Sequence, residues 1–145
     1  MENRSFYNEI LTEHNLHPEF KHDLPDADIV LEGVNPSCGD DIFLKLKLDG
    51  DVITDGAFVG DGCAISQASA DIMLGMIVGK KKEDALKMGD IFLKMIQGEA
   101  SEDEIDSLEE ASVLRDIAHM PARVKCAVLG WRTLKEALLD GDELS

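Results

Sequence analysis

Three cysteines and one aspartate of this chain are the residues that could do chemistry together. Cys38 lies in "NPSCGD", a segment of turn-forming residues, two positions before Asp40. Cys63 follows "VGDG", where a predicted strand gives way to a predicted helix, and Cys126 lies near the start of the last predicted helix, off its apolar stripe. A buried structural cysteine is expected at an apolar periodic position instead. The cysteines are therefore candidate metal ligands or nucleophiles, and a helix N-terminus favours the thiolate that both roles require.

Three thiolates and one carboxylate can form a tetrahedral zinc site. Such a site carries excess negative charge, so nearby cations would support it, and Arg123 and Lys125 are candidates because they lie close to Cys126 in the chain. The cysteines are far apart and form no CxxC pair, so their spacing alone leaves three alternatives open. These alternatives are a shared metal site, core or incidental cysteines, and a catalytic thiol that needs no metal.

The composition limits the classes of protein that remain. The chain has 145 residues, a net charge of −16 and 44% hydrophobic residues, which fits one domain with its own core. The excess of acid argues against nucleic acid, whose phosphates need clustered Lys and Arg, and favours a basic partner. The start "MENRSFYNEI" lacks the apolar segment of a secretory signal, and no apolar run is long enough for a membrane helix. We therefore expect a cytoplasmic protein that contacts no membrane.

The first half of the chain is predicted to form one helix and a small sheet. The pattern predicts a helix over 5–17, a linker over 21–28 and a short strand over 29–34. Apolar residues then alternate with polar ones in "DIFLKLKLDGDVITDGAFVG", which predicts two antiparallel strands joined by a turn at Asp49-Gly50.

The second half is predicted to be helical. After Cys63, apolar residues recur every three or four positions, which predicts a helix that ends at Gly79 and a second helix over 82–98. A last helix is predicted from Pro121 to Gly141. The fold class is therefore α+β: an N-terminal helix, a three-stranded antiparallel sheet, then helices packed on one face of the sheet, in a single domain over 1–145.

Two polar features are interpreted as surface. The segment 99–110 holds seven carboxylates and no base, and Ser101 with Glu104 predicts a capping box that opens a short solvated helix. A second hypothesis for this acidic segment is that it docks a basic face of a partner. The histidines near the N-terminus are also expected at the surface: His14, His17 and His22.

Three motifs together resemble a known family. "NPSCGD", "GDGCAISQAS" and "PARVKCAVLGW" are similar to the three cysteine motifs of the IscU/NifU N-terminal-like proteins of iron–sulfur cluster assembly, and the resemblance covers about residues 4–139. The metal ligands that it implies are Cys38, Asp40, Cys63 and Cys126. Two departures resemble the SufU branch: Lys125 stands where IscU proteins have a histidine, and about residues 99–118 form an insertion.

The resemblance to SufU implies a zinc-bound sulfur acceptor for the cysteine desulfurase SufS, with downstream Suf scaffold proteins as further partners. Such a protein would be a sulfur-transfer partner rather than a stand-alone enzyme. Cys38 is the expected sulfur acceptor, and Gly39 would let the chain turn so that Cys38 and Asp40 face one ion. Two alternatives remain: an IscU-like scaffold that assembles and transfers a [2Fe–2S] cluster from iron on the same residues, and a metal-free α+β binding domain.

Overall fold

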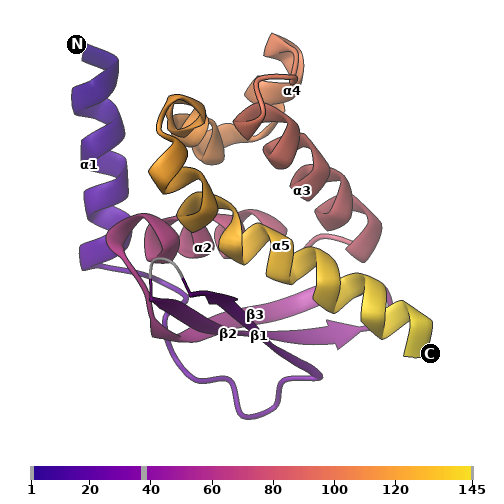
Figure 1. The fold of residues 1–145 in the computed structure, drawn as a ribbon. Coiled ribbons are helices and arrows are strands. Elements are labelled where there is room, and N and C mark those ends of the chain that lie inside the picture. The colour runs from indigo at the N-terminus through magenta and orange to yellow at the C-terminus, as the bar shows by residue number, and fades with distance from the viewer. Residues whose placement is uncertain (1, 37–38, 145) are drawn as a thin grey trace.

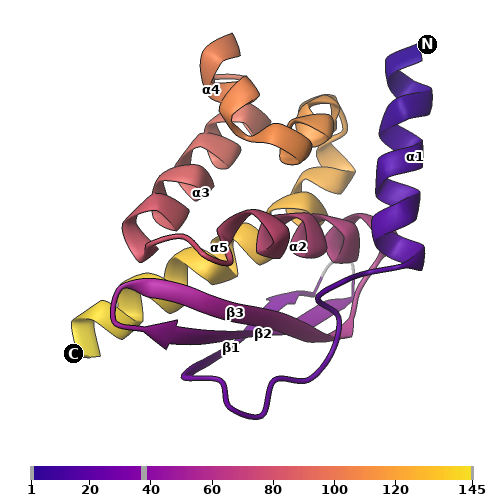
Figure 2. The same ribbon diagram turned by 180° about the vertical axis from the view of Figure 1, so that it is seen from behind.

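A three-stranded sheet with helices on one face forms the framework of the molecule (Figures 1 and 2). The computed structural model describes the backbone of residues 2–36 and 39–144 and the side chains of residues 9–36 and 39–139. The elements in chain order are α1 (Glu2–Leu16), β1 (Ile29–Asn35), β2 (Asp40–Asp49), β3 (Val52–Asp61), α2 (Ala64–Ile77), α3 (Lys82–Ile96), α4 (Glu102–Ser107), the 3₁₀ helix η1 (Glu109–His119) and α5 (Pro121–Leu144). Helices α2 and α5 lie next to the sheet, whereas α3 and α4 lie farther from it. The predicted α+β class is confirmed.

The sheet is antiparallel in the order β1-β2-β3, and the turn at Asp49-Gly50 joins β2 to β3 as predicted. The alternation in β2 divides its two faces, because successive strand residues point to opposite sides. Ile42, Leu44 and Leu46 are fully buried under the helices, while the intervening residues are only partly covered. The period-two pattern therefore fixed which face of the sheet meets the core.

Helices α2 and α5 pack closely because small residues line their contact. A Cβ atom on Gly130 would lie 3.3 Å from the Cβ of Ala70, so the two backbones approach tightly there. Trp131 of α5 is fully buried and stacks on Phe92 of α3, with ring centroids 4.4 Å apart. Its indole N–H donates a 3.2 Å hydrogen bond to Ser69 Oγ in α2, so α5 is held from two sides.

The acidic segment contains a helix type that the sequence analysis missed. The capping box of Ser101 and Glu104 is confirmed and opens α4, but η1 then runs for 11 residues as a 3₁₀ helix. Its carboxylates are exposed. Buried apolar residues recur every third position, from the residue before η1 onward: Leu108, Ala111, Leu114 and Ile117. That spacing matches the three residues per turn of a 3₁₀ helix, which explains why η1 presents one apolar stripe to the core.

Helix α5 is longer than expected. The predicted end at Gly141 is wrong, because the helix continues to Leu144. A glycine lowers helix propensity but ends a helix only where it takes up a left-handed capping conformation, as Gly79 does after α2 with φ +92°. Among the described residues, no helix combines the length and the hydropathy that a bilayer crossing requires.

Candidate metal centre

Asp40, Cys63 and Cys126 come together at one end of the sheet. Each offers one ligand atom, and these three atoms all lie within 4.8 Å of one another. Among the described residues, no other group of three such side chains meets this limit. We call Asp40, Cys63 and Cys126 the ligand cluster. Cys38, the fourth predicted ligand, lies outside the described residues.

Asp40 is the first residue of β2, and its side chain is only 1% exposed. Its Oδ1 accepts a 2.8 Å hydrogen bond from the backbone N–H of Cys63, so the carboxylate is tied directly to a second member of the cluster. On its other side, Asn35 pairs with Asp40 in the β1–β2 register. A carboxylate held at a strand end by a backbone donor is positioned before any ligand arrives.

Cys63 caps the N-terminus of α2. Its backbone is extended (φ −71°, ψ 169°), and its Sγ accepts a hydrogen bond from the N–H of Ser66 at 3.4 Å. Because the first N–H groups of a helix have no partner within the helix, they and the helix dipole favour negative charge on this sulfur. The predicted placement of Cys63 at a strand-to-helix junction is confirmed.

Cys126 lies in the second turn of α5 and is 2% exposed, although the sequence analysis placed it off the apolar stripe. It is buried because α5 is surrounded on several sides, by α2, α3, η1 and β1, and not on one stripe alone. The hydroxyl of Ser69 donates a 2.6 Å hydrogen bond to the carbonyl of Ala127, the residue after Cys126. This bond joins the helices that carry Cys63 and Cys126, so it helps to fix the distance between the two sulfurs.

The segment from the end of β3 to the start of α2 is crowded in a way that only glycine allows. A Cβ on Gly60 would lie 2.3 Å from the carbonyl oxygen of Asp41, and Gly60 has φ +117°. A Cβ on Gly62 would lie 2.4 Å from Ser66 Oγ and 3.3 Å from Asp40 Oδ1. These two glycines therefore let Cys63 approach Asp40. Gly39, next to the predicted ligands, has φ +74°, the conformation expected of a turn glycine.

The residues of the ligand cluster fit a thiophilic metal. Two sulfurs and one carboxylate oxygen are donors that zinc accepts, and cysteine sulfurs are also the usual ligands of iron–sulfur clusters. The predicted supporting cations, Arg123 and Lys125, lie in the first turns of α5 with exposed side chains. On the opposite face of β2, the Asp41 carboxyl raises the pKa of Glu32 through a hydrogen bond and charge repulsion.

A second polar group escaped the sequence analysis. His14 of α1 was expected at the surface, but its Nδ1 lies 2.6 Å from Oδ2 of Asp71, which is 1% exposed in α2, and its Nε2 bonds Glu110 of η1. Burial disfavours the charged imidazole, but these two carboxylates outweigh burial and raise the pKa of His14 above its ordinary 6.5. The sequence holds one sign of this polar group: Asp71 stands among the apolar residues of the helix predicted after Cys63.

The comparisons with known proteins agree with this fold and this cluster. The NifU-like N-terminal domain family matches residues 6–142. The chain therefore belongs to this family, which is one of iron–sulfur cluster assembly scaffold proteins, and the predicted resemblance is confirmed.

The relatives carry names from both branches of the family. The chain is 42% identical over 134 residues to the zinc-dependent sulfurtransferase SufU of Bacillus subtilis, covering 92% of this chain and 90% of that protein. It is 41% identical over 135 residues to the iron–sulfur cluster assembly scaffold protein IscU of Thermotoga maritima, covering 93% and 94%. A crystal structure of a candidate scaffold protein for the SUF system from Fervidobacterium islandicum is 39% identical, with a TM-score of 0.81 over 90% of this chain and 94% of that one.

Proposed function

We propose that this protein accepts sulfur from a SufS-type cysteine desulfurase in the cytoplasm and raises the turnover of that enzyme. The observation that carries the proposal is the convergence of Asp40, Cys63 and Cys126 within 4.8 Å. The similarity to a relative named a zinc-dependent sulfurtransferase supports zinc as the metal, with Cys38 as the fourth ligand. When bound, zinc would keep the cysteine ligands deprotonated and hold the site closed.

Cys38 is the proposed sulfur acceptor. Cys126 belongs to α5, Cys63 caps α2, and Asp40 is held by the N–H of Cys63. Cys38, in contrast, stands in a stretch of turn-forming residues in the sequence. In the transfer, the thiolate of Cys38 attacks the outer sulfur of the persulfide on the desulfurase. A new S–S bond forms at Cys38, the S–S bond of the desulfurase breaks, and its cysteine leaves as a thiolate. Arg123 and Lys125 would offset the negative charge of the site.

We further propose that residues 1–145 form one domain, with a core of about 4–139 and an insertion over about 99–118. The accepted sulfur would pass from Cys38 to a downstream Suf scaffold protein.

Desulfurase turnover tests the function. Zinc-loaded protein mixed with purified SufS should raise the rate of cysteine desulfuration, and Cys38→Ala should abolish this increase because the acceptor sulfur is gone. The same protein after zinc removal should also lose the increase. If chelated and zinc-loaded protein stimulate SufS equally, the metal-dependent mechanism is wrong.

The adjacent residues Asp40 and Asp41 provide a matched pair for the metal site. They lie on opposite faces of β2, and only Asp40 is buried in the ligand cluster. Asp40→Asn should lower zinc affinity at least about tenfold. Removing a residue that only hydrogen-bonds a metal ligand already lowers metal affinity by about 10–100-fold. Asp41→Asn removes the same charge one residue away and should leave zinc affinity unchanged. Equal losses in both variants would mean that only the local charge matters, and Asp40 would not be a ligand.

A second candidate function is supported by the 41% identical relative, which is named a cluster assembly scaffold. In that case a [2Fe–2S] cluster is the cargo of the same residues. Anaerobic reconstitution with iron and sulfide, followed by transfer to an apo-ferredoxin, tests this function. A protein that stays colourless and retains zinc after reconstitution would exclude it.

A further inference from the structure

A cavity of about 370 Å³ lies between α1, α2 and the start of η1, away from the ligand cluster. Figures 1 and 2 show these three elements side by side. Its apolar lining residues are buried or half-buried: Phe20, Ile72 and Met76. Its glutamates are exposed, so they surround the mouth: Glu13, Glu19, Glu109 and Glu110. We call this space the acidic cavity.

The cavity is open because α2 carries a glycine where it faces this space. Gly75 lies inside α2, and a Cβ built on it would have only one neighbouring atom within 4 Å, the Cε2 of Phe20 at 3.6 Å. Glycine is a poor helix former, and nothing in the backbone of α2 requires one at this position. Its missing side chain leaves room for a group from another molecule.

The charge of the lining defines the sign of that group. Among the described residues, five carboxylates line the cavity and the only basic groups there are the imidazoles of His14 and His17, so this lining stays negative even with both imidazoles protonated. His14 is already engaged by Asp71 and Glu110. Within the described part of the chain, the carboxylates of Glu13, Glu19 and Glu109 bond no other side chain.

Glu109 occupies a backbone position that does not suit glutamate. It is the first residue of η1, directly after the C-cap residue of α4, and with φ +51° it is the one non-glycine residue with positive φ in the described chain. Gly or Asn is preferred at such a position after a helix, because the left-handed conformation crowds a Cβ. An unfavourable residue is expected where its side chain has a use, and here the side chain lines the cavity.

We propose that the acidic cavity takes an arginine or lysine side chain of the desulfurase that docks on this protein, an inference that rests on the proposed function. The aliphatic part of such a side chain would lie along Phe20 and Met76, and its charged end would meet the glutamates at the mouth. A metal ion is a poorer occupant, because among the described residues only the ligand cluster brings three donor atoms within 4.8 Å.

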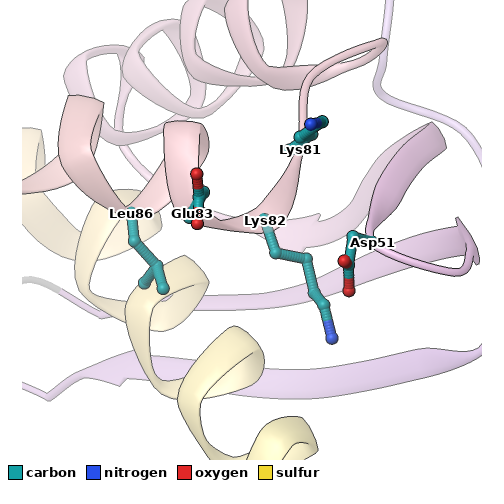
Figure 3. Close-up of a pocket in the computed structure, with 5 residues that line it drawn as sticks. All are labelled: Asp51, Lys81, Lys82, Glu83 and Leu86. Carbon is teal, nitrogen blue, oxygen red and sulfur yellow. The ribbon is translucent and has the colours of Figure 1, made fainter.

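The cavity at the start of α3 provides the contrast (Figure 3). It is smaller, about 220 Å³, and is lined by both signs of charge: Asp51, Lys81, Lys82, Glu83 and Leu86. Its two acids and two lysines balance, so its lining has no excess of either charge. Of these two cavities, only the acidic cavity has both an apolar interior and a clear excess of negative charge.

Two variants test the cavity by shape and by charge. Gly75→Leu fills the space without removing a charge, and Glu109→Asn removes a charge with a residue that tolerates the left-handed backbone. Each should weaken the binding of SufS about tenfold or more at low salt, as measured by calorimetry, because a cation would lose its room or one of its partners. Gly75→Ala and Glu99→Gln are the matched controls and should stay within twofold, since one methyl group leaves the cavity open and Glu99 lies outside it.

The readouts separate this inference from the proposed function. At saturating concentration, Gly75→Leu should keep its zinc and stimulate SufS as fully as the unchanged protein, because the ligand cluster is intact. If the unchanged protein stimulates SufS and Gly75→Leu binds as tightly, the inference is overturned and the proposed function stands. If SufS is not stimulated at all, the proposed function fails.

A small probe tests the cavity without the desulfurase. N-acetyl-arginine amide should shift the amide NMR resonance of Gly75, while the neutral isostere N-acetyl-citrulline amide should shift it far less. Equal shifts with the two probes would mean that the cavity has no preference for a cation and would overturn the inference.

Discussion

The ligand cluster and the acidic cavity are built in different ways. The three cluster residues lie at the start of β2, at the cap of α2 and in the second turn of α5, and they are held by backbone contacts such as the bond from the Cys63 N–H to Asp40. The acidic cavity has mostly exposed glutamates, and side-chain contacts such as those of His14 join its walls. The first arrangement fixes the positions of donor atoms, whereas the second supplies charge and space and leaves the side chains at its mouth exposed.

Helix α2 belongs to both regions. Cys63 caps its N-terminus, and Gly75 lies twelve positions later, which corresponds to roughly 18 Å along the helix axis. At that separation, substitutions in the two regions should have independent effects. The comparison can therefore be tested by changing a residue in one region and measuring binding in the other: zinc at the ligand cluster, the arginine probe at the acidic cavity.

The largest effect is expected from Cys126→Ser. The hydroxyl is nearly the same size as the thiol but is a poor ligand for a thiophilic metal, so stoichiometric zinc should be lost. Metal analysis after gel filtration measures the loss, and circular dichroism checks the fold. The arginine probe should shift Gly75 as before. A variant that keeps zinc would show that Cys126 is a buried thiol and not a ligand, and a variant that loses the probe response would show that the two regions are coupled.

A smaller effect is expected from Ser69→Ala. Ser69 accepts the indole N–H of Trp131 and donates to the carbonyl of Ala127, and all three residues are fully buried. Leaving the indole N–H without a partner should cost about 1–3 kcal/mol of unfolding free energy. Zinc affinity should also fall, because the bond joins the two helices that carry Cys63 and Cys126.

Urea unfolding followed by the fluorescence of Trp131 measures the stability of Ser69→Ala. Ser107→Ala is the control, since the Ser107 hydroxyl also donates to a backbone carbonyl but is exposed, and its loss should change stability by less than about 0.5 kcal/mol. No described side chain of α5 lines the acidic cavity, so binding of the arginine probe should persist in Ser69→Ala. If Ser69→Ala lost probe binding but kept its zinc affinity, the bond from Ser69 to Ala127 would support the acidic cavity and not the ligand cluster.

The sequence predicted the ligand cluster better than the acidic cavity, and the reason is physical. Cys63 and Asp40 occupy junctions between elements, and junctions can be located from the change in apolar period and from turn residues. Cys126 was predicted to lie near the start of a helix, which is correct, but its burial depends on how many elements surround α5. The closeness of the three residues required the family resemblance, because nothing local in the chain gives a distance between residues far apart in the sequence.

The acidic cavity could not be predicted because tertiary packing creates it. Gly75 is a single glycine within a helical pattern, and His14 and Glu110 are ordinary polar residues until α1 and η1 meet beside α2. The 3₁₀ conformation of η1 could have been suspected from the three-residue spacing of Leu108, Ala111, Leu114 and Ile117. The fold class and the hairpin turn at Asp49-Gly50, in contrast, follow from short-range patterns and were predicted correctly.

The smallest effect is expected in the pH dependence of stability, and it belongs to the acidic cavity alone. Since the pKa of His14 is raised in the folded protein, the charged imidazole stabilises the fold fully below about pH 6.5, and this contribution disappears as the pH rises through the raised pKa. The charged groups that face His14 are Asp71, Glu110 and the exposed glutamates of the cavity. His14 is partly exposed, so we expect a contribution below about 1 kcal/mol.

Urea unfolding at pH 6 and pH 8 in the unchanged protein and in His14→Gln measures this contribution. The stability difference between the two proteins should be larger at pH 6 than at pH 8, because the contributions of groups that both proteins share cancel in the difference. His22→Gln is the matched control, because His22 is exposed and its ring bonds a backbone carbonyl, that of Asp23, and no buried carboxylate among the described residues. A His14→Gln difference that is constant with pH would show that His14 joins α1 to α2 as a neutral hydrogen-bonding group. The imidazole of His14 would then carry no positive charge to offset Asp71 and Glu110. The lining of the acidic cavity would be more negative, and its preference for a cation would be stronger.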